Sequence, residues 1–240
     1  MNPPRIEALG DGALLIQCGE SIDVAINAQA LAIARAIDAA KLPGILDIAP
    51  AYASVCLRYE PREWIGADAA QSPFARLAQR LSTLVEDAAS SPVRGYYSLS
   101  HDAVGGESWG EGELLEIPVI YGGESGPDLD EVATHAGLMR EAVIDLHCGA
   151  EYRVAMLGFT PGFPYLLGLP DALHMPRRAT PRTRVPAGSV AIGGAQTGVY
   201  PRETPGGWHL IGRTSLNLFD PARDPPALLA PGMRVRFVAT

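Results

Sequence analysis

The pattern of residues in this chain changes at Gly158, and that change restricts the possible folds more than any other feature. From there onward glycine and proline recur every few residues, and no apolar positions repeat at helical spacing. Short apolar runs stand between these turn residues, at 189–192, 208–211, 216–219 and 235–238. Many short strands joined by Gly/Pro turns are typical of all-β architectures, so we expect a closed or nearly closed β-barrel.

Residues 1–90 follow a different pattern, in which helices and strands alternate. Apolar side chains recur at helical spacing over 22–41, and Pro43 and Gly44 end that helix. The same spacing predicts a second helix over 74–87. Short apolar runs predict strands at 13–18, 45–49 and 54–59. The order of these elements predicts a small α+β domain.

Residues 91–113 contain many glycines and few apolar side chains, so we expect a linker or an insertion there. A second domain is then expected over residues 114–240, beginning with a strand at 114–121. Two short helices should follow that strand as a hairpin, and Asp128 is placed to cap the first of them. The sequence therefore predicts an α+β domain, a connection, and a barrel domain that carries a helical hairpin.

The composition excludes several classes of partner. A net charge of −8 argues against nucleic acid or an anionic membrane, because both require a basic surface. No uncharged apolar stretch reaches the ~18 residues that a membrane span needs, and no secretory signal is visible, so we expect a cytoplasmic protein. The three cysteines form no C-x-x-C pair and predict no metal site. Cys148 beside His147 is interpreted as an ordinary helix residue rather than half of a catalytic pair.

Aromatic side chains gather in the loop that follows the predicted strand at 152–157. Residues 158–165 combine two glycines and two prolines with three aromatic rings. So rigid a loop presents its rings either as walls of a binding pocket or as a plug in one end of the barrel, and the residues leave both interpretations open. The candidates for ligand contact in this loop are Phe159, Thr160, Gly162, Phe163 and Tyr165.

Arginine is concentrated in residues 176–186, although the chain as a whole is acidic. The prolines of this segment keep it extended, so Arg182 and Arg184 should project on one side, whereas Arg177 and Arg178 should project apart. The planar guanidinium group suits carboxylate and phosphate, which makes Arg182 and Arg184 candidate anion ligands. The alternative is a solvated loop whose arginines pair with nearby acids.

Two further segments supply candidate contacts. Residues 187–201 form a glycine-rich run without a Walker A or dinucleotide-binding pattern, and its small residues either let backbone N–H groups approach a ligand or form tight turns at the barrel rim. Residues 204–214 add Arg213 as a candidate anion ligand. They also add His209, for which we favour a structural role over a role as an acid or base. The ligand-contact candidates of these two segments are Gln196, Thr197, Tyr200 and Trp208.

Together these segments resemble the family of allophanate hydrolase subunit 1, which includes one of the subunits of prokaryotic 5-oxoprolinase and the histidine-kinase inhibitor KipI. The resemblance is carried by GFTPGFPYLLGLPDALHMPRRATPRTRVPAGSVAIGGAQTGVYPRETPGGWHLIGRT, with IPVIYGGESGPDLDEVA and AEYRVAMLGF upstream. GDGALLIQCGESID and IAPAYASVCLRY match more loosely. The resemblance thus covers nearly the whole chain, and residues 90–112 are the departure from it.

The resemblance implies an α+β N-terminal domain followed by a cyclophilin-like β-barrel domain. It also implies a partner, a second cyclophilin-like subunit of the kind found in 5-oxoprolinase or as allophanate hydrolase subunit 2. The implied reaction uses ATP to open 5-oxo-L-proline to L-glutamate, with any Mg²⁺ held through the partner and with this chain inactive alone. Two alternatives remain: a urea- or allophanate-handling carboxylase subunit, and a KipI-like kinase inhibitor.

Under the oxoprolinase hypothesis, phosphorylation of the lactam oxygen makes ring opening feasible. Charge on the phosphoryl group would be neutralised by the catalytic candidates Arg182, Arg184 and Arg213. The small ring would be walled by Phe163, Tyr165 and Trp208, and its polar edge would be read by Gln196 and Thr197.

Overall fold

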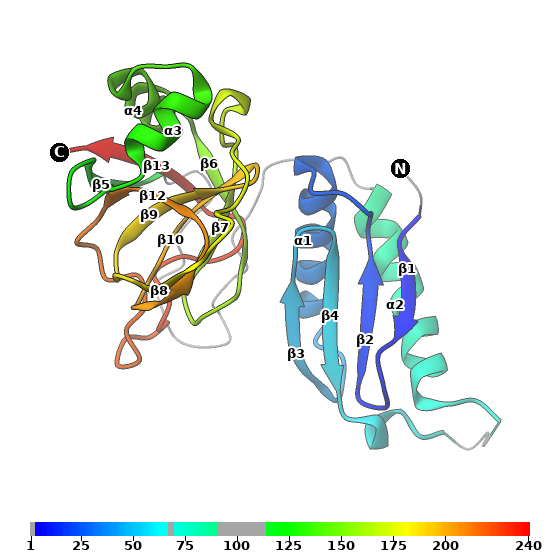
Figure 1. Cartoon of the computed structure of the whole chain (residues 1–240). Helices are drawn as coiled ribbons and strands as arrows, with labels where there is room; N and C mark the ends of the chain where they lie inside the picture. The colour runs from blue at the N-terminus through cyan, green and yellow to red at the C-terminus, as the bar shows by residue number, and fades with distance from the viewer. Residues whose placement is uncertain (1–2, 67–69, 91–113) are drawn as a thin grey trace. The chain divides into compact units, whose positions relative to one another are not determined.

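The computed structural model describes residues 3–66, 70–90 and 114–240 (Figure 1). Contacts within the chain divide it into two compact units, and the division falls inside the segment 91–113. The linker predicted for that segment lies outside the described residues. Each unit is described below by itself.

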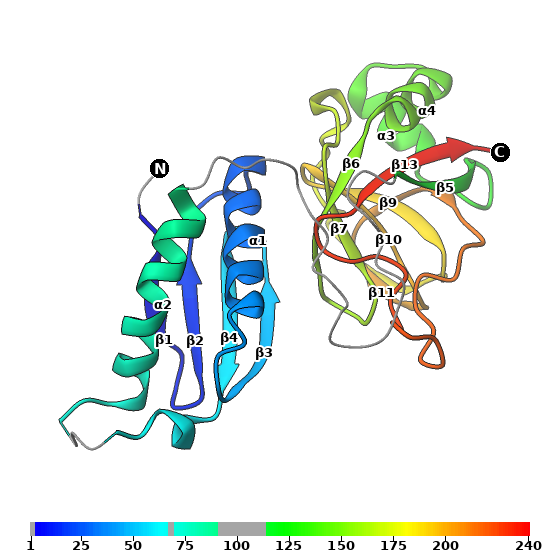
Figure 2. The same cartoon turned by 180° about the vertical axis from the view of Figure 1, so that it is seen from behind.

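The first unit is a four-stranded antiparallel sheet in the order β1-β2-β4-β3, with two helices. The helices lie together on one face of the sheet, as the front and back views show (Figures 1 and 2). The elements are β1 (Arg5–Ala8), β2 (Ala13–Gln17), α1 (Val24–Ala39), β3 (Ile45–Pro50), β4 (Ser54–Tyr59), a 3₁₀ turn η1 (Pro61–Trp64) and α2 (Pro73–Ser90).

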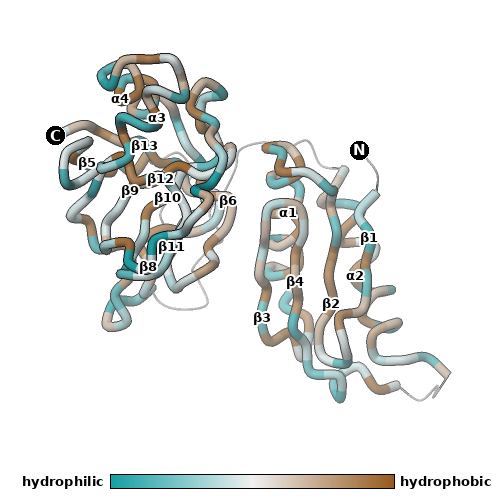
Figure 3. Tube along the Cα trace, viewed as in Figure 1, coloured by the Kyte–Doolittle hydropathy of each residue, from teal (hydrophilic) through white to brown (hydrophobic). Residues whose placement is uncertain are grey.

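The core of this unit follows the alternation of its strands. In β2 the side chains of Leu14 and Ile16 are fully buried while their neighbours are half-exposed, and Figure 3 shows β2 as a strongly apolar strand. Helix α1 begins two residues later than expected because Asp23 caps it: the carboxylate accepts hydrogen bonds from the backbone N–H groups of Ala25 (2.7 Å) and Ile26 (3.1 Å). The sequence predicted the helices and strands of this unit except for β1, whose residues are mostly exposed, and it did not predict the 3₁₀ turn η1.

The second unit contains the predicted barrel, which is closed and has the strand order β10-β7-β6-β13-β5-β12-β9. All neighbouring strands are antiparallel except β13 and β5, which run parallel over six residue pairs. The barrel strands are β5 (Leu114–Tyr121), β6 (Tyr152–Leu157), β7 (Pro164–Leu167), β9 (Ser189–Gly193), β10 (Gln196–Val199), β12 (His209–Arg213) and β13 (Arg234–Ala239).

Smaller elements complete the second unit. They are the helical hairpin α3 (Leu129–Ala136) and α4 (Arg140–Gly149), the 3₁₀ turn η2 (Asp171–Leu173), and a two-stranded sheet of β8 (Arg182–Val185) and β11 (Thr204–Gly206). Among the described residues, no helix has both the length and the apolar character needed to cross a membrane.

Two predictions for this unit were wrong. Residues 216–219 form no strand, because the Leu218 carbonyl accepts hydrogen bonds from the Leu228 N–H and from the Arg223 guanidinium, which fold this run into a closed loop. Asp128 stands before α3 but makes no side-chain capping bond. Its carboxylate binds two arginines and the Leu210 N–H instead.

Candidate functional site

Five of the predicted aromatic and loop residues meet at one small cavity of the barrel unit, with a volume of about 190 Å³. We call it the aromatic cavity. Its walls come from the loop before β7, the arginine segment, the end of β10 and the turn between β11 and β12. The lining residues are Phe159, Phe163, Tyr165, Arg177, Arg178, Pro181, Tyr200, Gly206, Gly207 and Trp208.

Phe163 is the centre of the aromatic wall. It is 2% exposed, and its ring makes edge-to-face contacts with Tyr165 (4.9 Å between centroids), Tyr200 (5.1 Å) and Trp208 (5.6 Å). Edge-to-face pairs of this kind fix the orientation of each ring beyond what apolar burial alone provides. The wall is therefore a rigid surface before any ligand arrives.

Glycines make room for these rings. A Cβ at Gly206 would lie 2.4 Å from the Tyr200 hydroxyl oxygen, and one at Gly198 would lie 2.7 Å from the Pro164 carbonyl oxygen and 3.1 Å from the Phe163 ring. Glycines of two segments, 187–201 and 204–214, thus shape the cavity by letting aromatic side chains pack against bare backbone.

Phe159 forms the rim of the cavity. It is 62% exposed, and its backbone has φ +66°, a left-handed conformation that non-glycine residues rarely adopt. Its ring still meets the Phe163 ring edge-on at 5.6 Å. Strain of this type persists only where the surrounding structure imposes it, and it is concentrated at ligand sites.

Arg177 is the one charged group at the cavity that the described residues leave without a carboxylate. Its guanidinium carbon lies 5.8 Å from the centroid of the Trp208 ring, within the range of a cation–π contact. Burial raises the pKa of the Tyr200 hydroxyl to about 12, whereas the positive charge of Arg177 acts in the opposite direction on that pKa and on the pKa of Tyr165. The guanidinium thus lies close enough to both tyrosines, which line the same cavity, to affect their pKa values.

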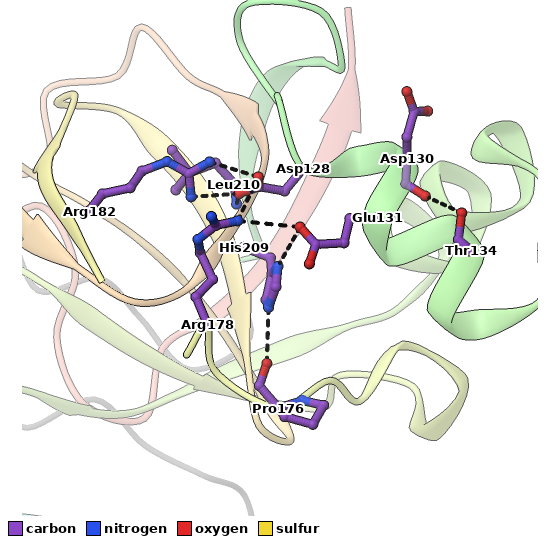
Figure 4. Close-up of polar contacts among 9 residues, drawn as sticks. All are labelled: Asp128, Asp130, Glu131, Thr134, Pro176, Arg178, Arg182, His209 and Leu210. Atoms are coloured by element: carbon purple, nitrogen blue, oxygen red, sulfur yellow. Dashed lines mark hydrogen bonds and ion pairs between the residues drawn. The ribbon is translucent and has the colours of Figure 1, made fainter. Parts of the chain in front are cut away.

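The neighbouring arginines are fixed by acids of the chain itself, in what we call the Asp128 cluster (Figure 4). Arg182 grips the Asp128 carboxylate with two nitrogens, at 2.8 and 2.7 Å. Arg178 bridges Asp128 (3.2 Å) and Glu131 (3.3 Å), and the Leu210 N–H donates to Asp128 at 2.7 Å. Asp128 is 4% exposed, so its charge is compensated by these donors alone.

The Asp128 cluster fixes the arginine segment above the barrel. The Arg178 N–H donates to the Gly207 carbonyl at 2.8 Å. His209, which the sequence left open as an acid or base, is buried and its Nε2 donates to the Pro176 carbonyl at 3.0 Å (Figure 4). These contacts favour a structural role for His209.

The remaining candidates lie outside the aromatic cavity. Arg184 is 77% exposed and pairs with Glu203, so Arg182 and Arg184 share no partner. Thr197 is fully buried, and Gln196 is buried beside Gly193 in the β9–β10 hairpin. Thr160 and Gly162 shape the loop behind Phe159: the Thr160 carbonyl accepts from the Phe163 N–H at 3.0 Å, and Gly162 has φ +78°.

Arg213 lines a second cavity of about 450 Å³, which we call the Arg213 cavity. Its Nε donates to the Ala187 carbonyl at 2.9 Å, and no described carboxylate pairs with it. The two cavities meet along the chain: Tyr200 lines the aromatic cavity, and the next residue, Pro201, lines the Arg213 cavity. The lining residues are Ile120, Ser125, Ala187, Gly188, Pro201, Arg213, Thr214, Ser215, Leu216 and Asn217.

A buried chain of hydrogen bonds in the barrel unit was not predicted. His147 is fully buried, its Nδ1 lies 2.7 Å from the Tyr121 hydroxyl, and its Nε2 lies 3.0 Å from the Thr197 hydroxyl. The Thr197 hydroxyl donates to the Ala191 carbonyl, so it accepts from Nε2–H, and Nδ1 accepts from Tyr121. Burial lowers the pKa of His147 to about 3. Both ring nitrogens of the neutral His147 are used in hydrogen bonds to side chains of the barrel unit. We therefore assign His147 a structural role.

Within the described residues, no three His, Cys, Asp or Glu side chains gather in a metal-binding arrangement. The chemistry that the described part of the barrel unit offers includes aromatic walls, a small and a larger cavity, and at each cavity an arginine that no described carboxylate pairs with. Such sites suit a small planar ligand and an anion.

A sheet-and-helix unit followed by a closed barrel places the chain in a known class. The chain belongs to the carboxyltransferase domain family, subdomains C and D, whose family model matches residues 4–229. It is 52% identical to the 5-oxoprolinase B-type subunit of Escherichia coli O157:H7 over 202 residues, which are 77% of this chain and 91% of that protein. It is 42% identical to the same subunit of Bacillus subtilis (strain 168), over 98% of this chain and 92% of that protein. The resemblance seen in the sequence is thereby confirmed.

Solved structures have the same architecture. The crystal structure of TTHA0988 superposes with a TM-score of 0.75 at 40% identity, covering 95% of this chain and 39% of that one. This chain therefore spans about two fifths of TTHA0988. The urea carboxylase of Kluyveromyces lactis superposes with a TM-score of 0.67 over 99% of this chain and 22% of that chain, at 20% identity, which shows a shared fold.

Proposed function

We propose that this chain is a subunit of an ATP-dependent 5-oxoprolinase, a hydrolase that opens 5-oxo-L-proline to L-glutamate, and that the aromatic cavity binds the lactam. The observation that carries the proposal is the convergence of Phe159, Phe163, Tyr165, Tyr200 and Trp208 on one cavity of about 190 Å³. This space suits a five-membered ring and is too small for a nucleotide. The proposal is supported by relatives at 42–57% identity, which are named as 5-oxoprolinase subunits.

The Arg213 cavity is our proposed site for the phosphate groups of ATP. Its donors fit a phosphate: a guanidinium without a described carboxylate, the hydroxyls of Ser125 and Ser215, and the amide of Asn217. ATP would supply the phosphoryl group that activates the lactam carbonyl. Arg213 would bind and orient that anion, which replaces the role first expected of Arg182 and Arg184, since both already bind acids of the chain.

The complex that we propose has a second, cyclophilin-like subunit. The chain itself is then a two-domain protein, with its barrel as a cyclophilin-like domain, and it is cytoplasmic and inactive alone. In this proposal any Mg²⁺ contacts are assigned to the partner. The partner also supplies the remaining catalytic groups.

The experiment that tests this function measures ATP hydrolysis by the chain co-expressed with its genomic neighbours, with and without 5-oxo-L-proline. We expect 5-oxoproline to stimulate hydrolysis, and we expect that stimulation to vanish when this subunit is omitted. A stably assembled complex that ignores 5-oxoproline would contradict the proposal.

A second candidate function is a urea- or allophanate-handling carboxylase subunit. The family description as a carboxyltransferase domain and the fold shared with a urea carboxylase favour it. Urea in place of 5-oxoproline in the same assay separates the two functions, because only the carboxylase hypothesis predicts stimulation by urea.

A further inference from the structure

We infer that Arg177 is the receptor for a ligand carboxylate, so that the aromatic cavity selects small cyclic acids over neutral amides. The inference rests on the proposed function for the identity of the ring. It adds a specificity-determining residue and a charge requirement that the function alone does not contain.

The first step is the distribution of acids around the arginine segment. Arg178 and Arg182 bind Asp128, and Arg184 binds Glu203. Arg177 differs from all three, because among the described residues no carboxylate pairs with it. What sets Arg177 apart within the arginine segment is that it stands, without a described carboxylate, at the wall of a cavity whose other walls are aromatic.

The second step is the position of the guanidinium. It lies over the Trp208 ring and beside Tyr165 and Tyr200, so its planar fork is presented where aromatic rings form the other walls. No carboxylate of the described residues lines the cavity, and Arg178, the other charged lining residue, is already neutralised by Asp128 and Glu131. A ligand carboxylate would therefore meet one positive charge without a competing acid.

The third step is the fixed backbone on both sides of Arg177. Met175 and Gly194 exchange two backbone hydrogen bonds, of 3.1 and 2.6 Å, and the Arg178 N–H donates to Gly207 at 2.8 Å. Together with the Asp128 cluster, these contacts hold the segment before a ligand binds. A backbone that is already ordered loses little conformational entropy when the ligand binds, so the entropy lost on binding is confined to the exposed Arg177 side chain.

The consequence is a preference that can be measured with a pair of ligands. 2-Pyrrolidinone is the same lactam without the carboxylate. A hydrogen-bonded charge contributes about 1.5–3 kcal/mol, so we expect 5-oxoproline to bind about 10- to 150-fold more tightly than 2-pyrrolidinone.

Calorimetric titration of the co-expressed complex with 5-oxo-L-proline, L-proline and 2-pyrrolidinone tests the inference. The Arg177→Ala variant should bring the two lactams to nearly equal affinity, and Arg177→Lys should restore part of the preference. Arg184→Ala is the matched control, because Arg184 lies in the same segment but is exposed and paired with Glu203; it should keep the wild-type preference.

Retention of the full preference in Arg177→Ala, or equal binding of both lactams by the wild type, would overturn the inference while leaving 5-oxoproline-stimulated ATP hydrolysis intact. Arg177-dependent binding of L-proline, without ATP turnover on 5-oxoproline, would uphold the receptor and remove the proposed function. If neither acid binds the wild-type complex, the inference is wrong.

Discussion

The Asp128 cluster and the aromatic cavity are neighbours in the barrel unit and treat their arginines in opposite ways. In the cluster, one buried carboxylate receives Arg182, Arg178 and a backbone N–H, and every charge has its partner inside the chain. In the cavity, Arg177 faces aromatic rings, and the described residues give it no acid. Arg177 and Arg178 are adjacent in sequence, but the chain itself supplies the carboxylates that pair with Arg178. For Arg177, we propose that a ligand supplies the carboxylate.

Polar groups that the chain satisfies by itself have a different role from polar groups that it leaves unsatisfied. Buried polar groups that the chain satisfies by itself define the architecture, because removing one partner leaves the other desolvated and unpaired. A group at a cavity wall that the chain does not satisfy is available for recognition. The predictions below test whether the internally satisfied groups behave as scaffold and the unsatisfied ones as binding groups.

The largest effect should follow from opening the Asp128 cluster. Asp128→Ala leaves Arg182 partly buried without its acid and the Leu210 N–H without its acceptor, so we expect the free energy of unfolding to fall by about 3–5 kcal/mol. Chemical denaturation measures this. Asp130→Ala is the control, since Asp130 is exposed and pairs with Arg140 at the surface, where about 1 kcal/mol or less is expected. Equal losses in the two variants would refute the role of the cluster.

A second scaffold element is His147. His147→Gln leaves the Tyr121 and Thr197 hydroxyls imperfectly paired, and we expect a loss of about 1–3 kcal/mol at neutral pH. Thermal denaturation of the variant and the parent protein measures it. Full retention of stability would mean that this hydrogen-bond chain is dispensable.

The same residue predicts a pH dependence. His147 has a pKa of about 3 in the folded chain, below the unfolded value of ~6.5, so the folded state binds fewer protons between these values. Its contribution to stability is therefore complete above about pH 6.5 and is lost as the pH falls toward about 3. His147→Gln should flatten that decline in a series of denaturation curves. If the free energy of unfolding falls with pH as steeply in the variant as in the parent protein, a group other than His147 is responsible for the decline.

Arg213 tests the other side of the comparison. Arg213→Ala should leave stability nearly unchanged, because the residue is exposed and its side chain makes one bond to the Ala187 carbonyl, while raising the KM for ATP in the complex about tenfold. Steady-state kinetics at varied ATP with saturating 5-oxoproline gives the value. An unaltered KM would place the phosphate groups of ATP outside the Arg213 cavity.

The smallest effect is expected at Arg184. Its ion pair with Glu203 is exposed, so Arg184→Ala should change the free energy of unfolding by less than about 1 kcal/mol and leave ATP turnover intact. Denaturation and the ATP assay together check this. A large loss of ATP turnover in a stable Arg184→Ala complex would mean that Arg184 does take part in the reaction.

Much of the fold was predictable because local patterns determine it. Short apolar runs predicted β2 and β4, and helical spacing predicted α1 and α2 to within a few residues at each end. Residues 216–219 were not predictable from their apolar pattern: Leu218 is buried as a core residue, but a loop closed by Arg223 carries it there instead of a strand.

The candidate site was predicted in part. The aromatic rings were found because prolines and glycines mark a rigid loop around them. The choice among arginines could not be made, since it depends on Asp128, which lies 54 residues from Arg182 in the sequence. The same limit applies to Thr197, which the hairpin turns inward to His147, 50 residues away.

The parallel pairing of β13 with β5 has a consequence for synthesis in the cell. The sheet of the first unit is complete once Tyr59 has been made, so it is available to fold while translation continues. In contrast, β5 ends at residue 121, and one of its two neighbouring strands, β13, begins only at residue 234. Throughout that interval the nascent barrel cannot close, so we expect it to be the part of the chain most exposed to misassembly during synthesis.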